Sequence, residues 1–405
     1  MEDLARNVDA DLLPLVEENK NHLWIGENPP FDFATVDFLT SQDLRLSPEH
    51  HQQYDVVWVY EKDLADLPAG KYELVLDELV RCLGASGKLV IRHSQNDRFS
   101  NIRLKHFLGR RFNTRTYVLD EWQENRVITT VFQVERENLS QYSQDDWTFA
   151  LITVGKRIDN VLAFLNSVRR DDPSFEHEII ICGPTNPLYE PFRVTYLPPP
   201  REAYRDRLAE ISRKKNDIAD FASKANLFIA HDRYRLDENF FSGFVRYGYD
   251  FDFVSVLQWY ECGTRFPAYV AMDGPTLTYQ HPIDYVDYST VEESQYLNGG
   301  LLIAKTQTMR TLRFNDLLFW NQAEDVELSH LFRSKGLPPR INCHSSATTI
   351  GVTTDHTGNF LPPPTRPLSP IRRKSRPPIK SIRDIGRTIE RSIRPYLKAI
   401  KGRVA

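Results

Sequence analysis

The sequence predicts an α/β protein with two strand-and-helix domains and a basic C-terminal segment. An apolar strand, an amphipathic helix and a second apolar strand follow one another within residues 1–140, and the same order recurs within residues 147–360. Proline and then positive charge accumulate after this second region. We therefore expect two domains, a Pro-rich linker at 361–378 and a basic amphipathic helix at 379–405.

The composition is that of a globular protein large enough for two or three domains. Of its 405 residues, 41% are hydrophobic and 12% are aromatic, which is ample for packed cores. We expect neither a secretory leader nor a membrane span. The sequence does not open with a positively charged stretch followed by an apolar one, and it has no run of about 18 apolar residues. The four cysteines lack the paired spacing of a disulfide framework or a zinc site, which suits a reducing compartment. They are Cys82, Cys182, Cys262 and Cys343.

The first domain has the pattern of a strand, a helix, a Gly turn and a strand at 54–60, 72–83, 84–87 and 88–91. This order resembles the second half of an S-adenosylmethionine-dependent methyltransferase, which is Rossmann-like. Where such enzymes carry a glycine-rich loop, this sequence has Gly26 alone, with Asn28-Pro29-Pro30 shortly after, and this loop cannot approach a cofactor closely. We expect a degenerate domain used for packing or partner binding, with a working methyltransferase as the alternative.

The second domain begins after a polar linker at 135–146. Phe149–Val154 and His177–Gly183 are predicted strands on either side of an amphipathic helix, and together they make a strand–helix–strand unit. The ligands of such α/β units bind beyond the carboxyl ends of the strands. Leu227–Ala230 is a further apolar strand, and charged residues follow it directly at 231–233.

Two segments later in the chain combine glycine or acidic residues with an apolar element. Asn298–Lys305 is predicted to be a Gly-Gly turn that leads into an apolar strand, and Glu324 and Asp325 open an amphipathic helix. Carboxylates at a helix start lie in a favourable dipole field, and one that faces a cleft can accept a proton from a hydroxyl group. The alternative is an ordinary acidic pair at a helix N-terminus without chemistry.

In their order along the chain, these motifs resemble a nucleotide-sugar-dependent glycosyltransferase of the A-type fold. The similarity is to the large inverting family that builds bacterial polysaccharides. It extends from Trp147 to about His344, which is about half of the chain, and it rests on the order of several weak motifs. The resemblance implies a second Rossmann-like domain that binds a nucleotide-sugar donor and a glycan acceptor.

The resemblance implies a role for each motif. Asp325 would be the general base that deprotonates the acceptor hydroxyl, and Glu324 would support it. The basic residues would neutralise the donor diphosphate, since Lys and Arg clusters suit phosphates, although a basic run is more often a solvated helix start. The implied donor-binding residues are Thr153, Gly155, Lys156, Lys214, Lys215, Asn216, Asp232, Arg233, Asn298, Gly299 and Gly300. The acceptor candidates are Trp259 and Tyr260, in an aromatic stretch whose rings suit stacking on sugars, and Trp320, which could flank the acceptor. Core packing is the alternative for each single aromatic residue of that stretch.

The family also implies a divalent metal, Mn²⁺ or Mg²⁺, that bridges the donor diphosphate. Asp232 would be one ligand and His344 a later one, but Arg233 stands where the family places a second carboxylate. Hard divalent ions prefer several oxygen ligands, whereas a fixed guanidinium can neutralise phosphate directly. The sequence leaves metal dependence open.

The C-terminal tail differs from the rest of the chain in charge. Residues 366–405 contain thirteen Lys or Arg and two acidic residues, a net charge of +11, so the remaining residues carry −15 of the total of −4. Isoleucines at intervals of three and four line the other face of the predicted helix. This pattern favours an anionic membrane surface over nucleic acid, with docking onto partner enzymes as the rival interpretation.

The sequence thus predicts a cytoplasmic enzyme, peripheral to the inner face of the cell membrane. It would transfer a sugar from a nucleotide donor to a lipid-linked glycan such as an O-antigen or capsule chain. One alternative is an inactive scaffold of a polysaccharide-assembly complex, which the missing second carboxylate and the missing glycine loop favour. The other is an active methyltransferase that modifies the same glycan.

Overall fold

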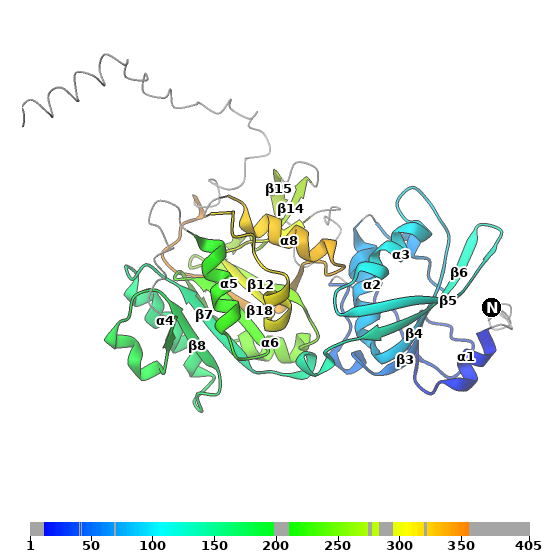
Figure 1. The fold of residues 1–405 in the computed structure, drawn as a ribbon, viewed down its shortest axis with the longest axis horizontal. Helices are drawn as coiled ribbons and strands as arrows, with labels where there is room; N and C mark the ends of the chain where they lie inside the picture. Colours follow the sequence, from blue (N-terminus) through cyan, green and yellow to red (C-terminus); the bar gives the residue numbers. More distant parts are fainter. Residues whose placement is uncertain are drawn as a thin grey trace, which may run out of the picture. The chain divides into compact units, whose positions relative to one another are not determined.

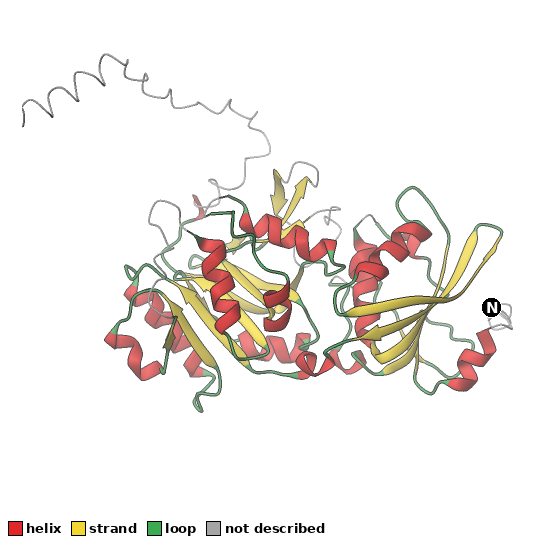
Figure 2. Ribbon diagram, in the orientation of Figure 1, coloured by secondary structure: helices red, strands yellow, loops and turns green. Residues whose placement is uncertain are grey.

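The computed structural model describes residues 12–39, 41, 43–68, 70–197, 210–273, 278–282, 295–319 and 322–355. Within them it is a mixed α/β structure with a six-stranded, a nine-stranded and a three-stranded sheet (Figures 1 and 2). Trp320 and the predicted linker and helix at 361–405 lie outside the described residues. None of the helices in the described part of the chain is long and apolar enough to cross a membrane.

The six-stranded sheet has the strand order β2-β1-β3-β4-β6-β5. Its first four strands are parallel, and β6 runs antiparallel to both β4 and β5. The predicted helix at 72–83 is confirmed as α2 (Lys71–Cys82), whose apolar residues belong to the core. The other elements are α1 (Leu13–Glu18), β1 (His22–Ile25), β2 (Ala34–Val36), η3 (Pro48–His50), β3 (Tyr54–Val59), η4 (Leu64–Asp66), β4 (Leu83–His93), α3 (Asn101–Arg110), β5 (Thr114–Glu124), β6 (Val127–Arg136) and η5 (Leu139–Ser143).

The predicted Gly turn at 84–87 is wrong. These residues belong to β4, because Gly87 pairs with Val134 of β6 and the ladder continues on both sides of it. A Cβ atom on Gly87 would lie 2.9 Å from Leu83 Cδ2 and 3.1 Å from the Asp55 carbonyl oxygen. The glycine therefore permits close packing at the start of a strand.

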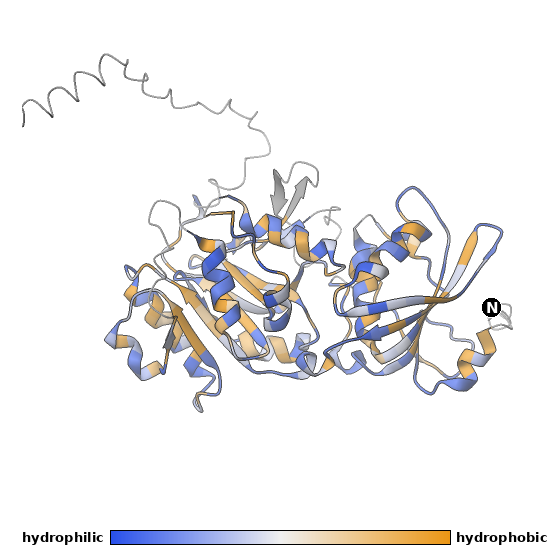
Figure 3. Ribbon diagram, in the orientation of Figure 1, coloured by the Kyte–Doolittle hydropathy of each residue, from blue (hydrophilic) through white to orange (hydrophobic). Residues whose placement is uncertain are grey.

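The nine-stranded sheet follows the order β11-β18-β12-β17-β10-β7-β8-β9, with β13 paired to β12. Figure 3 shows apolar residues concentrated along its strands and polar residues prominent on α5. Its strands and the three-stranded sheet are β7 (Trp147–Ile152), β8 (Glu178–Cys182), β9 (Thr195–Tyr196), β10 (Asn226–His231), β11 (Tyr234–Leu236), β12 (Phe253–Tyr260), β13 (Arg265–Phe266), β14 (Tyr269–Asp273), β15 (Thr278–Pro282), β16 (Gln295–Leu297), β17 (Leu301–Lys305) and β18 (Arg340–Thr349). The helices are α4 (Ile158–Arg170), η6 (Pro187–Phe192), α5 (Ile211–Phe221), α6 (Phe240–Tyr247), α7 (Thr306–Thr311) and α8 (Glu324–Ser334).

The strand register brings three predicted motifs to one edge of this sheet. β7 and β10 are parallel, and Ile152 at the end of one strand pairs with His231 at the end of the other. β17 runs antiparallel to β10, so that its first residue, Leu301, pairs with Ala230. The turn that follows β7, the charged residues that follow β10 and the Gly-Gly turn that precedes β17 therefore meet.

The six-stranded and nine-stranded sheets belong to one compact unit, Met1–Leu361. One apolar cluster includes residues of both, such as Leu74 of α2 and Phe253 of β12.

The same unit contains a buried network of charges. Asp77 of α2 accepts hydrogen bonds from three guanidinium groups. They belong to Arg81, Arg111 and Arg340.

Candidate active site

A pocket of about 470 Å³ lies at the carboxyl ends of β7 and β10. Parallel α/β sheets bind ligands at this position because the loops that follow the strands diverge there. The predicted donor residues Thr153, Lys156 and Lys214 lie on its wall. The full lining is Ile152, Thr153, Val154, Lys156, Arg157, Ile211, Lys214, His231, Asp232 and Arg233.

Asp232 is the acidic residue among those that line the pocket. Thr153 Oγ1 donates a hydrogen bond of 2.7 Å to its Oδ2, and Arg157 Nη1 lies 3.3 Å from its Oδ1. Gly155, which has a φ of +78°, donates its N–H to Thr153 Oγ1 and so completes the turn after β7. Both carboxylate oxygens of Asp232 are thus held by protein groups.

Positive charge surrounds the pocket. Four of its lining residues are Lys or Arg, against one carboxylate. His231 responds to this charge, because burial lowers its pKa well below the ordinary value and the nearby cations, Arg233 first, lower it further. Its Nε2 is buried without a hydrogen-bond partner in the structure. A neutral imidazole among cations leaves the pocket suited to a multiply charged anion such as a diphosphate.

The Gly-Gly turn connects this pocket to the acidic pair at the start of α8. The Gly300 carbonyl accepts the His231 N–H at 3.0 Å, and the Gly299 N–H donates to Asp325 Oδ2 at 2.7 Å. The neighbours of both glycines lie close to the backbone, and those of Gly299 leave the least room for a side chain. A Cβ atom on Gly300 would lie 2.5 Å from Arg233 Nη2, and one on Gly299 would lie 2.7 Å from Asp325 Cβ.

Asp325 is not itself a lining residue of the pocket and lies beyond the Gly-Gly turn. Its pKa is raised to about 6, because burial disfavours the charged form and the Glu324 carboxylate adds repulsion, while Lys215 and the Gly299 N–H oppose the shift. The backbone N–H of Val326 donates to the second carboxylate oxygen at 3.0 Å. Each oxygen keeps a further lone pair, so the group can still accept a proton.

Two predicted donor residues occupy other positions. Lys215 is fully buried, and its ammonium group donates to the Gly299 carbonyl at 3.0 Å and to Glu324 Oε1 at 3.2 Å. Asn216 is also buried and is hydrogen bonded to the backbone of Phe314 in both directions. Neither residue lines the pocket, since successive positions on α5 face different sides of the helix and only Lys214 and Ile211 of this helix reach it.

The predicted acceptor residues are only partly available. Tyr260 is 2% exposed and packs on Phe266 with ring centroids 5.1 Å apart, so its assignment to acceptor stacking is corrected to a core role. Trp259 alternates with it along β12 and is half-buried. Asn298, which was predicted to bind the donor, lies in the Gly-Gly turn. Its side-chain oxygen accepts a hydrogen bond of 2.8 Å from the Gly300 N–H.

The structure places His344 beside Asp43 and Cys343 and not beside Asp232. Ile350 hydrogen bonds the Arg233 carbonyl, and His344 lies six residues before it on β18, roughly 15–20 Å away at strand spacing. Near Asp232 the pocket offers one carboxylate, already bound to Thr153 and Arg157, among four cations. This set of side chains does not fit a divalent ion, which requires several oxygen ligands.

Two further residues belong to this site, and their sequence patterns predicted no role for them. Arg157 forms the ion pair with Asp232, and Asn160 on α4 donates to the carbonyl oxygens of Asp232 and Ile350. A signal for Arg157 was present, because it directly follows Lys156 in the turn after β7. No local signal identified Asn160, since its partners are 72 and 190 residues away in the chain.

The loop after β1, where the methyltransferase alternative requires a cofactor, is closed by Glu61. Its Oε2 accepts hydrogen bonds of 2.9–3.0 Å from Trp24 Nε1 and from the N–H groups of Glu27 and Asn28. Burial raises the pKa of Glu61, but these hydrogen bonds outweigh that effect and the pKa is lowered. These hydrogen bonds hold the Glu61 carboxylate, in its ionised form, against the loop.

Comparison with known proteins gives weak similarities. No known protein family matches the chain, and no curated protein matches it. GalNAc-T7, in a crystal structure with UDP, GalNAc and Mn²⁺, is 14% identical with a TM-score of 0.40, over 52% of this chain and 44% of that chain. Two structures of S. aureus TarS also match, and one of them is of residues 1–349. The structure of residues 1–349 is 12% identical with a TM-score of 0.33, over 50% of this chain and 60% of that chain. The other is 14% identical with a TM-score of 0.34, over 53% of this chain and 38% of that chain.

This chain spans less than two thirds of the length of each of these structures. The low identities and TM-scores leave the function to be inferred from the site itself.

Proposed function

We propose that this protein is a glycosyltransferase that moves a sugar from a nucleotide-sugar donor to a glycan acceptor. The observation that carries the proposal is the cation-lined pocket at Asp232, joined by the Gly-Gly turn to a carboxylate with a raised pKa at Asp325. The pocket suits a diphosphate, and the carboxylate suits the removal of a proton from a hydroxyl group. A nucleotide-sugar donor and a sugar hydroxyl supply these two groups.

In the proposed reaction the acceptor hydroxyl lies next to Asp325. Its oxygen forms a bond to the anomeric carbon of the donor sugar while Asp325 takes the hydroxyl proton. The bond between that carbon and the donor phosphate breaks, and the nucleoside diphosphate leaves with the electron pair. Arg233, with Lys156 and Lys214, stabilises the leaving group by charge, so that no metal ion takes part in the step. Direct displacement by one base inverts the anomeric centre.

The acceptor in this proposal is a lipid-linked polysaccharide. Residues 379–405, with their basic charge and aliphatic spacing, suit an anionic membrane surface and would hold the enzyme close to such an acceptor. The direct test of function is the release of nucleotide from a panel of nucleotide sugars in the presence of membrane extract that supplies acceptors. If no donor binds or turns over, the inactive-scaffold alternative takes the place of the enzyme.

Replacement of Arg233 by Ala is expected to weaken nucleoside-diphosphate binding about 10- to 100-fold, because a charge-assisted hydrogen bond contributes about 1.5–3 kcal/mol. Isothermal titration with UDP, GDP and ADP measures this loss. Arg235→Ala is the matched control, since Arg235 is exposed on β11 two residues further on. Equal affinity of the Arg233 variant and the wild type would contradict the assignment of the pocket.

Removal of divalent metal is expected to leave nucleotide release unchanged within about twofold, because the cations of the pocket already offset the diphosphate charge. The rate is measured with a chelator, and then with added Mn²⁺ or Mg²⁺. Loss of turnover in chelator, with recovery on adding Mn²⁺ in the wild type and in Cys343→Ser alike, would contradict a metal-independent step at the pocket.

A further inference from the structure

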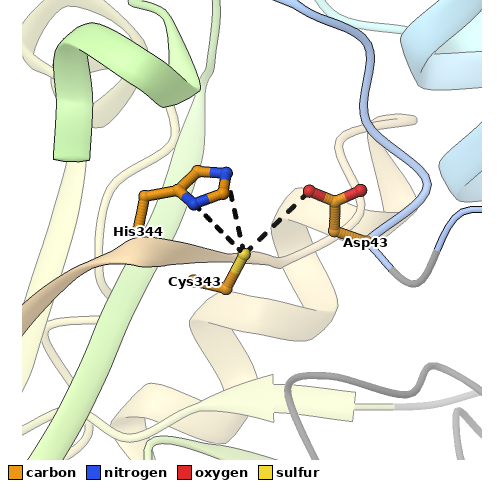
Figure 4. A group of neighbouring side chains, drawn as sticks. All are labelled: Asp43, Cys343 and His344. Atoms are coloured by element: carbon orange, nitrogen blue, oxygen red, sulfur yellow. Dashed lines mark hydrogen bonds between the residues drawn. The ribbon is translucent and has the colours of Figure 1, made fainter.

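A second group of side chains, remote from the pocket, has the arrangement of a metal site. Asp43 lies in the segment between β2 and η3, and Cys343 and His344 lie on β18 (Figure 4). Cys343 Sγ is 3.9 Å from the ring nitrogens of His344 and 4.0 Å from Asp43 Oδ2. One ligand atom of each residue lies within 4.8 Å of the others. We propose that these three residues bind a zinc ion.

The spacing of the ligand atoms supports a tetrahedral ion. Zinc binds sulfur at about 2.3 Å and nitrogen or oxygen at about 2.0–2.1 Å, so two of its ligand atoms are separated by about 3.6 Å. The observed Sγ separations of 3.9 and 4.0 Å are close to this value, but Sγ is equally far from both His344 nitrogens, so the ring must turn to direct one nitrogen at the ion. A thiolate, an imidazole and a carboxylate are also the ligand types that zinc uses, whereas magnesium and calcium prefer oxygen alone.

An irregularity in β18 places two consecutive residues on one side of the strand. Asn342 pairs with Val256 of β12, and the next pair is Ser346 with Leu257, so residues 343–345 have no counterpart on β12. The Asn342 side chain accepts the His344 N–H at 2.9 Å and donates to Ser345 Oγ at 2.8 Å. In a regular strand neighbouring side chains point to opposite faces. The bulge removes this restriction and lets Cys343 and His344 converge.

Asp43 is held in position by its own neighbours. Its Oδ1 accepts the backbone N–H of Arg45 at 3.2 Å, which leaves Oδ2 directed toward Cys343. The Arg45 guanidinium donates to the Asp250 carbonyl at 2.8 Å and to the Glu78 carboxylate at 2.9 Å. These hydrogen bonds hold the segment that carries Asp43 in place. Partners that orient a ligand in this way are a common feature of metal sites.

The site is accessible to an ion, and zinc binding would displace the proton of the Cys343 thiol. All three side chains are partly exposed, so an ion can reach them from solvent. With Zn²⁺ bound, the charges of thiolate and carboxylate are balanced.

Such a site would join two regions of one compact unit that lie 300 residues apart in the chain. Its fourth coordination position is left to water or to a further ligand, because three of the protein's side chains converge in the described part of the chain. The inference does not depend on the proposed glycosyltransferase activity, since Asp232 and Asp325 belong to another site.

The test uses the full-length protein, freed of metal with a chelator and titrated with Co²⁺, which reports thiolate ligation by a near-ultraviolet charge-transfer band. We expect one equivalent to bind with this band and Zn²⁺ to displace it. Cys343→Ser should abolish the band, and His344→Ala and Asp43→Asn should each weaken zinc binding by about 100-fold, since losing even an outer partner costs about 10- to 100-fold.

Cys262→Ser is the matched control, because Cys262 is exposed near Thr264 and should leave the band unchanged. Zinc should also raise the melting temperature of the wild type and of this control, but not of Cys343→Ser. A wild-type protein that binds no stoichiometric Co²⁺ with a thiolate band would overturn the proposal. So would a band that persists in Cys343→Ser, because another thiol would then be the ligand.

Discussion

Replacement of Asp325 by Asn is expected to lower the turnover number about 10²- to 10⁴-fold, because a positioned general base contributes about this much to rate. Donor affinity should change little, since the donor pocket is lined by other residues. The Asn amide oxygen can still accept the Gly299 N–H, but its NH₂ group would face the Val326 N–H, and two donors cannot hydrogen bond to each other. A modest loss of stability is therefore also expected. Nucleotide release, donor titration and thermal unfolding separate these effects.

Glu327→Gln is the matched control for this variant. Glu327 is on the same helix, two residues after Asp325, and the charge that acts on its carboxylate is that of His330. Near-normal turnover is expected of this control. If Asp325→Asn turned over at a rate close to that of the wild type, Asp325 would be a structural acceptor for the Gly299 N–H and another group would remove the proton.

The pH profile tests the same assignment independently. A base acts only when it is deprotonated, and the pKa of Asp325 is about 6. The wild-type value of kcat/KM should therefore be constant above this pH and fall about tenfold per pH unit below it. The acid limb should be absent from the residual activity of Asp325→Asn. A wild-type profile without this limb would exclude Asp325 as the base.

Replacement of Asp77 by Asn should destabilise the protein by about 3–5 kcal/mol, because it leaves buried guanidinium groups without their shared counter-ion. Asp77 is fully buried and accepts hydrogen bonds of 2.9–3.0 Å from Arg81, Arg111 and Arg340. Denaturant unfolding measures the change in free energy. Asp97→Asn, at an exposed position of the same region, should change it by no more than about 0.5 kcal/mol.

The stability lost in Asp77→Asn should depend on pH in a defined direction. Burial raises the pKa of Asp77, but the three guanidinium groups outweigh it and lower the pKa from 3.8 to about 2. A lowered pKa in the folded state means that the stabilisation is complete above the unfolded value of 3.8 and is lost as the pH falls toward 2. The difference between wild type and Asp77→Asn should therefore shrink below pH 4. A difference that is constant down to pH 2 would contradict this account.

The sequence predicted the local elements well where hydrophobic periodicity was clear. The strands at 149–154 and 227–230, the helix at 72–83 and the helix that opens at Glu324 are all confirmed within one or two residues. The convergence of the motifs on one sheet edge also follows from local rules, because the ends of adjacent parallel strands lie side by side. The strand at 84–87 was not predictable locally, since Ser86 and Gly87 pair with Glu135 and Val134 of β6, far along the chain.

Individual site residues were less predictable than the motifs that contain them. Lys214, Lys215 and Asn216 are consecutive, yet the first lines the pocket and the other two are buried. The orientation of α5 decides this, and packing against the rest of the molecule sets that orientation. His344 likewise has a side chain suited to a metal, but the register of β18 places it near Asp43 and away from Asp232.

By itself the sequence determined the alternation of strands and helices, the position of the charged motifs at strand and helix ends, and the basic composition of the tail. These features depend on interactions over a few residues, where side-chain periodicity and turn chemistry act. Only the tertiary structure decided the contact of Arg233 with Gly300, the burial of Lys215, the ion network at Asp77 and the meeting of Asp43 with Cys343. Each joins residues far apart in the chain, and such contacts exist only when the elements between them have packed.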